Sequence, residues 1–365
     1  MRSPRLLRAA AVLAVLALAT PALFAASNGQ DPTTPPILDA QGQPVRTSIS
    51  SLEPVVVGDV PQWIAIRGHD IWNPVLLHLD DGPGASHMAW NRQYLSGLER
   101  HFIVVSWDAR GAGKSFNPRH TDKLTLDRYV ADTLEMAHML AQRFRQERIF
   151  LVGHGFGAIV GTLAAQKRPE LFHAFVAAGP RPHPAEGDRM AYRFALEHAE
   201  KAGDAALTAK LTAQGPPPYA GADMVMKYDT MRDAAATLAG TPANPFRATR
   251  AAALQEAPEY SAAERGRLAA ARAETHAALS AQVAIVNLPA QAPSLAVPVY
   301  FAVGRYDRGN ASIAEAYFGR LQAPRKELVW FEASGDFPAY EEPSTFVELL
   351  TRVVRDTARR RETTN

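Results

Sequence analysis

The chain has 365 residues, a length that suits one large domain carrying an insertion. Hydrophobic residues make up 47% of it and charged residues 21%, a balance that indicates a sizeable core and excludes an intrinsically disordered protein. Lys and Arg total 39 against 37 for Asp and Glu, which excludes the broad basic field of a nucleic-acid-binding protein. The sequence contains no cysteine, so disulfides, thiolate metal sites and a cysteine nucleophile are excluded as well.

Residues 1–27 have the pattern of a secretory signal peptide. Three arginines lie among the first eight residues, an uncharged run follows over 9–26, and small residues end that run after Pro21. These features favour cleavage and export of the mature chain to the periplasm or the medium. The alternative is an uncleaved anchor, because a run of 18 such residues can just span a bilayer, and only then do we expect membrane contact. Residues 28–51, which contain four prolines, are expected to form a linker or a loose lead-in strand.

Strand and helix patterns alternate over residues 52–180 and again over 297–365. Two short runs predict a hairpin around Pro61. The expected strands are at 55–60, 63–67, 75–79, 102–108, 149–152, 174–178, 297–303 and 327–331. The expected helices are at 126–144, 156–167, 311–321 and 343–359. This alternation predicts an α/β fold with a mostly parallel sheet that helices cover on both faces.

Residues 181–296 interrupt this pattern with an Ala-rich, helical segment that proline clusters break. We interpret the segment as a helical cap over the carboxyl ends of the strands, the edge where ligands bind in open α/β sheets. An independent second domain is the alternative. The return of the same strand and helix pattern after residue 296 argues against it.

The strand at 149–152 runs into the sequence Gly153-His154-Gly155-Phe156-Gly157 and then into a helix. A serine at the centre of such a turn would be a nucleophile elbow, in which tight backbone geometry pushes the side chain out from the sheet edge. The central residue here is Gly155, which has no side chain and supplies no nucleophile. A serine in this conformation bears backbone strain of the order of 1–3 kcal/mol, and glycine does not.

Several motifs in order, between Trp63 and about Thr357, resemble those of prolyl iminopeptidase-like serine hydrolases of the α/β-hydrolase superfamily. The motifs are Asp80-Asp81-Gly82-Pro83-Gly84 where that family has H-G-G-P-G, Trp107–Ser115 matching W-D-x-R-G-x-G-x-S, residues 151–157 where it has L-V-G-H-S-W-G, Gly304-Arg305-Tyr306-Asp307 matching G-R-Y-D, and Ser334-Gly335-Asp336-Phe337-Pro338 where it has S-x-H-F-P. The resemblance implies an α/β-hydrolase fold with an inserted cap.

Carried over from the family, the Ser, Asp and His of the catalytic triad fall on Gly155, Asp307 and Asp336. Asp307 keeps the position of the triad acid, whereas the nucleophile and the base are absent. None of the 11 histidines lies on the loop that should carry the base. His154 precedes the nucleophile position, but the family has this histidine as well and does not use it as the base.

The oxyanion-hole region falls on Asp80, Asp81, Gly82 and Phe156, where two carboxylates replace a histidine and a glycine. One oxyanion-hole donor stabilises the developing negative charge by about 3–4 kcal/mol. Carboxylates at the mouth of the hole, with Asp336 nearby, would oppose that charge. These replacements therefore point in the same direction as the loss of the nucleophile.

Four further motif residues are expected to shape or support the pocket: Asp108, Arg110, Ser115 and His154. Ser86 and Ser115 follow Gly-rich turns and are the candidates for a relocated nucleophile. Both are better explained as hydroxyls that cap or stabilise turns.

The leading hypothesis is an exported pseudoenzyme that binds a small or peptide-like ligand, or a partner, and needs no cofactor or metal. One alternative is a hydrolase that uses Asp307 and Asp336 as an acid/base dyad, or a cation site that Asp80 and Asp81 complete. An ion pair with Arg110 or Arg305 is the simpler expectation for those carboxylates. A third, weaker possibility is nucleotide binding, because Gly153-x-Gly155-x-x-Ala158 fits G-x-G-x-x-A.

Overall fold

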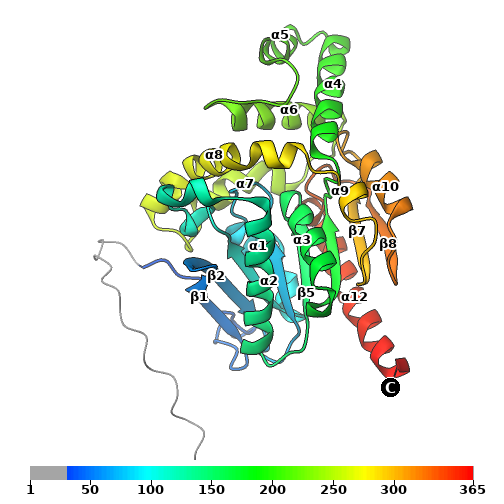
Figure 1. The fold of residues 1–365 in the computed structure, drawn as a ribbon. Helices are drawn as coiled ribbons and strands as arrows, with labels where there is room; N and C mark the ends of the chain where they lie inside the picture. Colours follow the sequence, from blue (N-terminus) through cyan, green and yellow to red (C-terminus); the bar gives the residue numbers. More distant parts are fainter. Residues whose placement is uncertain (1–30, 365) are drawn as a thin grey trace, which may run out of the picture. The chain divides into compact units, whose positions relative to one another are not determined.

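The computed structural model describes residues 31–364, so the expected signal peptide or anchor lies outside the described residues. Within that part of the chain, eight strands form one sheet in the order β1-β2-β4-β3-β5-β6-β7-β8 (Figure 1). The strands are β1 (Ile49–Val57), β2 (Val60–Gly68), β3 (Val75–Leu79), β4 (Ile103–Asp108), β5 (Ile149–His154), β6 (Phe172–Ala178), β7 (Val299–Gly304) and β8 (Lys326–Phe331). β2 pairs antiparallel with β1 and β4, and the other neighbours are parallel.

The expected hairpin is present, but its turn lies at Gly58 and Asp59 and not at Pro61. Both turn residues have positive φ, which suits a tight hairpin connection, whereas Pro61 lies inside β2 opposite Val56. β1 begins at Ile49, within the segment expected as a linker. The preceding residues contact the core, as in the hydrogen bond from Arg67 Nη1 to Thr34 Oγ1 at 2.8 Å.

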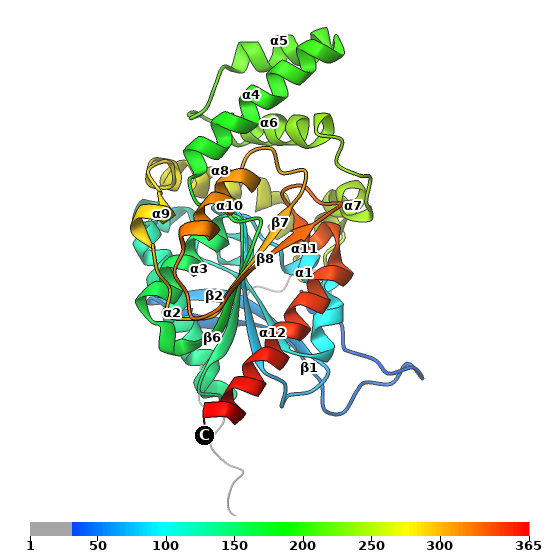
Figure 2. The same ribbon diagram turned by 90° about the vertical axis from the view of Figure 1, so that its right-hand side faces the viewer.

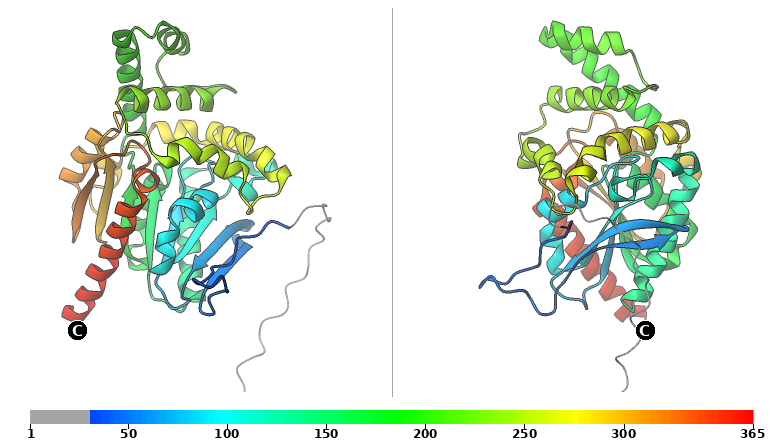
Figure 3. Two further views of the ribbon diagram at one scale, coloured as in Figure 1. Left: turned by 180° about the vertical axis from the view of Figure 1, so that it is seen from behind. Right: turned by 90° about the vertical axis from the view of Figure 1, so that its left-hand side faces the viewer.

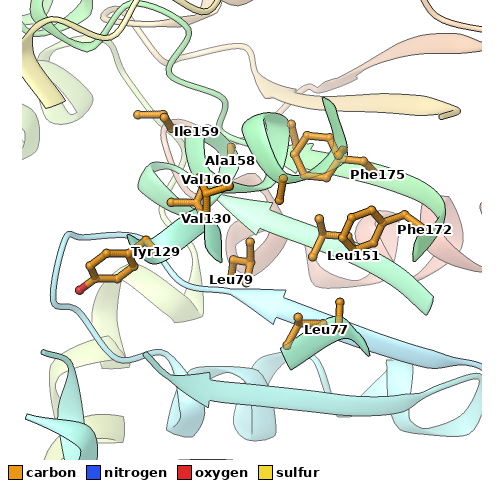
Figure 4. Close-up of a cluster of buried hydrophobic side chains, with 14 of the residues drawn as sticks. Leu77, Leu79, Tyr129, Val130, Leu151, Ala158, Ile159, Val160, Phe172 and Phe175 are labelled. Atoms are coloured by element: carbon orange, nitrogen blue, oxygen red, sulfur yellow. The ribbon is translucent and has the colours of Figure 1, made fainter. Parts of the chain in front are cut away.

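Helices cover both faces of the sheet (Figure 2). On one face lie α2 (Leu126–Arg143), α3 (Phe156–Lys167) and α10 (Ala311–Arg320), and on the other lie α1 (Met88–Tyr94) and α12 (Pro343–Thr364). The central strands are buried on both sides, which explains why most of their residues are hydrophobic. Figure 4 shows side chains of the first face, with Leu77 and Leu151 of the sheet near Val160 of α3.

Six helices lie between β6 and β7 and form the cap: α4 (Pro184–Ala202), α5 (Ala205–Gln214), α6 (Met224–Leu238), α7 (Pro245–Gln255), α8 (Ala262–Ala284) and α9 (Leu288–Gln291). α4, α5 and α6 share a small core of their own around Ala195, Leu211 and Met231. Views from two further sides show α7 and α8 lying between α6 and the end of the sheet (Figure 3). The cap therefore sits over the sheet edge at which the parallel strands end.

α8 is tied to the core by polar contacts in its first turn and near its middle. Lys114 Nζ forms an ion pair with Glu264 at 2.8 Å, and Thr275 Oγ1 donates a hydrogen bond to the Gly111 carbonyl at 2.7 Å. Ser261 and Glu264 form a capping box that fixes the first turn of the helix. No helix in the described part of the chain is both long and apolar enough to cross a bilayer.

Candidate functional site

The turn between β5 and α3 has the geometry of a nucleophile elbow. Gly155 has a φ of 52° and a ψ of −108°, a backbone conformation that side chains strongly disfavour. Its neighbour Gly157 approaches β3 so closely that a Cβ there would lie 2.2 Å from the Leu79 carbonyl oxygen. The chain thus has the tight turn and the close packing of an elbow, although the turn carries no nucleophile.

The carboxylate of Asp81 fills the space that the side chain of a nucleophile would occupy. A Cβ built on Gly155 would lie 2.0 Å from Asp81 Oδ1. The same oxygen accepts a hydrogen bond from the backbone N–H of Phe156 at 2.7 Å. In a serine hydrolase of this fold, the N–H of the residue after the nucleophile stabilises the oxyanion. Asp81 therefore places an anion of the protein's own in the oxyanion hole.

Positive charge around Asp81 keeps its carboxylate ionised. Burial alone would raise the pKa of Asp81, but its charged surroundings and the Phe156 N–H outweigh burial and hold this pKa well below its usual range. Arg181 and Arg232 supply this positive charge. The ring of His154 does not contribute, because burial lowers the pKa of His154 and keeps the ring neutral. Asp188 binds both arginines, at 2.8 Å to Arg181 and 3.0 Å to Arg232.

Asp80 differs from the expectation, because its carboxylate points away from the elbow. Its Oδ2 accepts the backbone N–H of His87 at 2.6 Å, and its Oδ1 lies 3.0 Å from His78 Nδ1. Burial raises the pKa of Asp80 well above its usual value. The successive residues Asp80 and Asp81 thus face different environments, and only Asp81 stands in the oxyanion hole.

Asp307 and Asp336 line the same cavity, at the ends of neighbouring strands. Asp307 Oδ1 accepts the backbone N–H groups of Gly309 and Asn310, at 3.0 and 2.8 Å. Burial, and then the negative charge of Asp336, raise the pKa of Asp307. Asp336, which the resemblance predicts at the base position, forms an ion pair with Arg247 of the cap at 2.8 Å.

The ion-pair expectation for these carboxylates therefore holds for Asp336, but with an arginine that the sequence motifs did not single out. Arg110 binds Asp132 at 2.9 Å beside the β1–β2 turn, and Arg305 binds Glu332 at 2.6 Å. Arg247 lies in α7, 89 residues before Asp336 in the chain. It also pairs with Glu341, so one cap arginine bridges two carboxylates of the core and leaves no free acid/base dyad.

Glu341 gives this cluster a pH dependence. Its side chain is fully buried, and burial, followed by the charge of Asp336, raises its pKa from 4.5 to about 7. The folded state therefore keeps this proton between pH 4.5 and 7 while the unfolded chain loses it, so stability falls as the pH rises through that window. We expect Glu341→Gln to remove this pH dependence of the free energy of unfolding. At pH 8 the variant should be more stable than the wild type by about 1–3 kcal/mol, and at pH 4.5 the two should be equally stable. Urea unfolding at the two pH values measures the difference, and a constant difference would contradict the prediction.

His154 lies against the cavity in one defined tautomer. Its Nε2 is 2.9 Å from the carbonyl oxygen of Asp336, and because a carbonyl only accepts, Nε2 carries the proton. The ring stacks on Phe337 with centroids 4.9 Å apart. Its Nδ1 is then a hydrogen-bond acceptor, and it has no partner among the described residues.

The two candidate replacement serines have structural partners. Ser86 is buried and shares hydrogen bonds with Asp108 and with the hydroxyl of Tyr260. Asp108 also accepts the Lys114 N–H at 2.7 Å, and burial raises its pKa to about 6. Ser115 Oγ accepts the Trp63 N–H at 2.7 Å and donates to the Asp108 carbonyl. Neither serine has a histidine partner among these bonds. Three of the motif residues support the fold and do not line the site, namely Asp108, Arg110 and Ser115.

Two adjoining cavities lie at the elbow. The smaller has a volume of about 40 Å³, room for roughly three water-sized groups, and its lining includes Asp81, His154, Asp307 and Asp336. The larger has about 390 Å³ and lies between the core and α6, α7 and α8 of the cap. Asp81, Arg232 and Asp336 line both. Among the described residues, no group of three or more His, Cys, Asp or Glu side chains is arranged to hold a metal ion.

The family model for serine aminopeptidase, S33, matches residues 85–334 of this chain, which include the elbow, the cap and the loop of the acid position. The chain belongs to the S33 serine aminopeptidase family. This S33 family member is 28% identical over 316 residues to the probable aminopeptidase YbaC of Bacillus subtilis (strain 168), a match that covers 86% of this chain and 98% of YbaC.

Solved structures confirm the α/β-hydrolase fold of this S33 family member. A proline iminopeptidase-related protein from Thermus thermophilus superposes with a TM-score of 0.56 at 22% identity, covering 84% of this chain and 98% of the other. The proline iminopeptidase of Mycobacterium smegmatis gives a TM-score of 0.57 at 17% identity, with the same two coverages. The predicted fold class and the resemblance to prolyl iminopeptidases are therefore confirmed.

Proposed function

We propose that this S33 family member has no serine-hydrolase activity and binds a small or peptide-like ligand between its core and its cap. The observation that carries the proposal is the hydrogen bond from the Phe156 N–H to Asp81 Oδ1 at 2.7 Å. A chain that had lost only its nucleophile would leave an empty oxyanion hole. Here the hole holds a carboxylate, which would repel the negative charge that acyl transfer develops.

The retained architecture supports a binding role. The elbow turn, the cap and a cavity of about 390 Å³ are all present, and this volume falls within the range of small-molecule sites. Apolar groups and charged groups both line that cavity, among them Trp90, Leu254, Phe337 and Arg265. Relatives named as aminopeptidases suggest a ligand of peptide-like size.

We also propose that the protein is exported, which the basic start and the uncharged run of residues 9–26 support. Those residues lie outside the described part of the chain. Sequencing the amino terminus of the mature protein tests this proposal, since cleavage predicts a start near Asn28 and retention of the segment would contradict it.

A fluorophosphonate probe for serine hydrolases tests the proposed lack of activity. The wild type should remain unlabelled, because no serine stands at the elbow. Gly155→Ser alone should label weakly or not at all, since Asp336 cannot deprotonate the serine as a histidine would and Asp81 still fills the oxyanion hole. Strong labelling of the wild type, abolished by changing one cavity residue, would overturn the proposal.

A further inference from the structure

The smaller cavity contains the place where the triad histidine would stand. The loops that carry Asp307 and Asp336 are adjacent, as shown by the hydrogen bond from the Tyr306 N–H to the Ser334 carbonyl at 2.9 Å. In a working triad, the acid stabilises the positive charge that the base acquires. With the histidine replaced, Asp307 keeps its orientation but has no cationic partner within ion-pair distance among the described residues.

Most of the other charges around this cavity are paired, whereas Arg308, which also lines it, is exposed and lies over the Phe194 ring at 5.6 Å without an ion pair among the described residues. Arg181 and Arg232 share Asp188, and the carboxylate of Asp81 balances the second arginine. Arg247 binds Asp336 and Glu341, and the raised pKa of Glu341 leaves it partly protonated near neutral pH. Asp307 lines this cavity and forms no ion pair with any described residue.

Two further acceptors without a partner belong to side chains that line the same cavity. His154 is 1% exposed, and its Nδ1 accepts no hydrogen bond within the described structure. Asn310 Oδ1 is buried and has no donor there either. Buried acceptors normally have donors. A group that brings several N–H donors and one positive charge would satisfy all three residues together.

We propose that the smaller cavity binds the ammonium group of a primary amine through Asp307, His154 Nδ1 and Asn310 Oδ1, with the amine's apolar body in the larger cavity. An ammonium carries three donors and no acceptor, which matches these acceptors. The larger cavity adjoins at Asp81 and Asp336, and its wall offers Trp90, Leu254, Leu268 and Phe337 to an alkyl or aromatic chain. The inference rests on the proposed function, because it names the class of ligand for that same site.

Calorimetric titration of the full-length protein with n-hexylamine tests the inference. We expect saturable binding of n-hexylamine and none of 1-hexanol or hexanoate, which have a similar body and a neutral or negative head. Asp307→Asn should weaken n-hexylamine binding by about 10- to 100-fold, the effect of losing a charge-assisted hydrogen bond. The matched control is Glu332→Gln, which removes an exposed carboxylate beside Arg305 and should leave binding unchanged.

A second variant tests whether the apolar body of the ligand occupies the larger cavity. Leu268→Trp should fill part of the larger cavity and abolish n-hexylamine binding, while methylamine, which needs only the smaller cavity, still binds. Unchanged affinity in Asp307→Asn, equal binding of hexanoate, or displacement of the amine by Ca²⁺ alone would overturn the inference. Probe labelling of the wild type would defeat the proposed function without affecting this equilibrium measurement, so the two failures can be told apart.

Discussion

Restoring three residues together, as Gly155→Ser, Asp336→His and Asp81→Gly, is expected to give a protein that a fluorophosphonate probe labels. The elbow supplies the tight turn, and Asp307 stands where it can orient and charge-stabilise a histidine at position 336. Removing the carboxylate of Asp81 frees the Phe156 N–H for an oxyanion. Glycine at position 81 also leaves space for the serine Cβ, which would otherwise lie 2.0 Å from Asp81 Oδ1.

The matched control is the double variant Gly155→Ser with Asp336→His, which keeps Asp81. We expect the triple variant to label at least about 10²-fold faster than the double variant, the scale of one oxyanion-hole donor. Time-resolved labelling with the same probe measures both rates. Equal rates would show that Asp81 does not block the oxyanion hole, and no labelling of the folded triple variant would show that the cavity has diverged beyond these positions.

Local sequence patterns predicted the fold well because the burial of each element shows in its residues. The mostly hydrophobic runs at β3, β4 and β5 predicted strands buried on both faces, and the structure has them there. The sequence patterns misplaced the turn of the β1–β2 hairpin. Pro61 suggested a turn, yet it lies in an outer pair of strands, where β2 tolerates a residue without an N–H donor.

The site could be predicted only in part, because it depends on contacts between distant segments. Sequence placed Asp307 and Asp336 at the acid and base positions, but it could not show that Arg247 of the cap reaches Asp336. Nor could it separate Asp80 from Asp81. The two residues are adjacent, yet one turns toward His87 and the other toward Phe156. The sequence therefore shows that position 81 is an aspartate, but it does not show that the Asp81 side chain occupies the oxyanion hole.

The W-D-x-R-G motif makes a different kind of contribution, which stability measurements can separate from the site. Arg110 is buried, and it donates hydrogen bonds to Asp132 at 2.9 Å and to the Gly58 carbonyl at 2.9 Å. It therefore joins the hairpin turn, the motif loop and α2. Gln62 Nε2 also donates to Asp132, so the carboxylate is the centre of a buried network. Such a network makes each member costly to remove on its own.

Arg110→Met is expected to lower the free energy of unfolding by about 3–5 kcal/mol, because it leaves the carboxylate of Asp132 buried without its main partner. Arg128, which also pairs with Asp132 at 2.7 Å, places the expected loss toward the lower end of that range. Urea unfolding at pH 7 measures the loss. Adding Asp132→Leu should recover part of it, since removing both charges leaves neither one unpaired. The exposed counterpart Arg305→Met should change stability little, as surface pairs generally do. If Arg110→Met were as stable as the wild type but did not bind n-hexylamine, Arg110 would act in the site. If the variant were destabilised but still bound n-hexylamine while folded, the role of Arg110 would be in the scaffold alone.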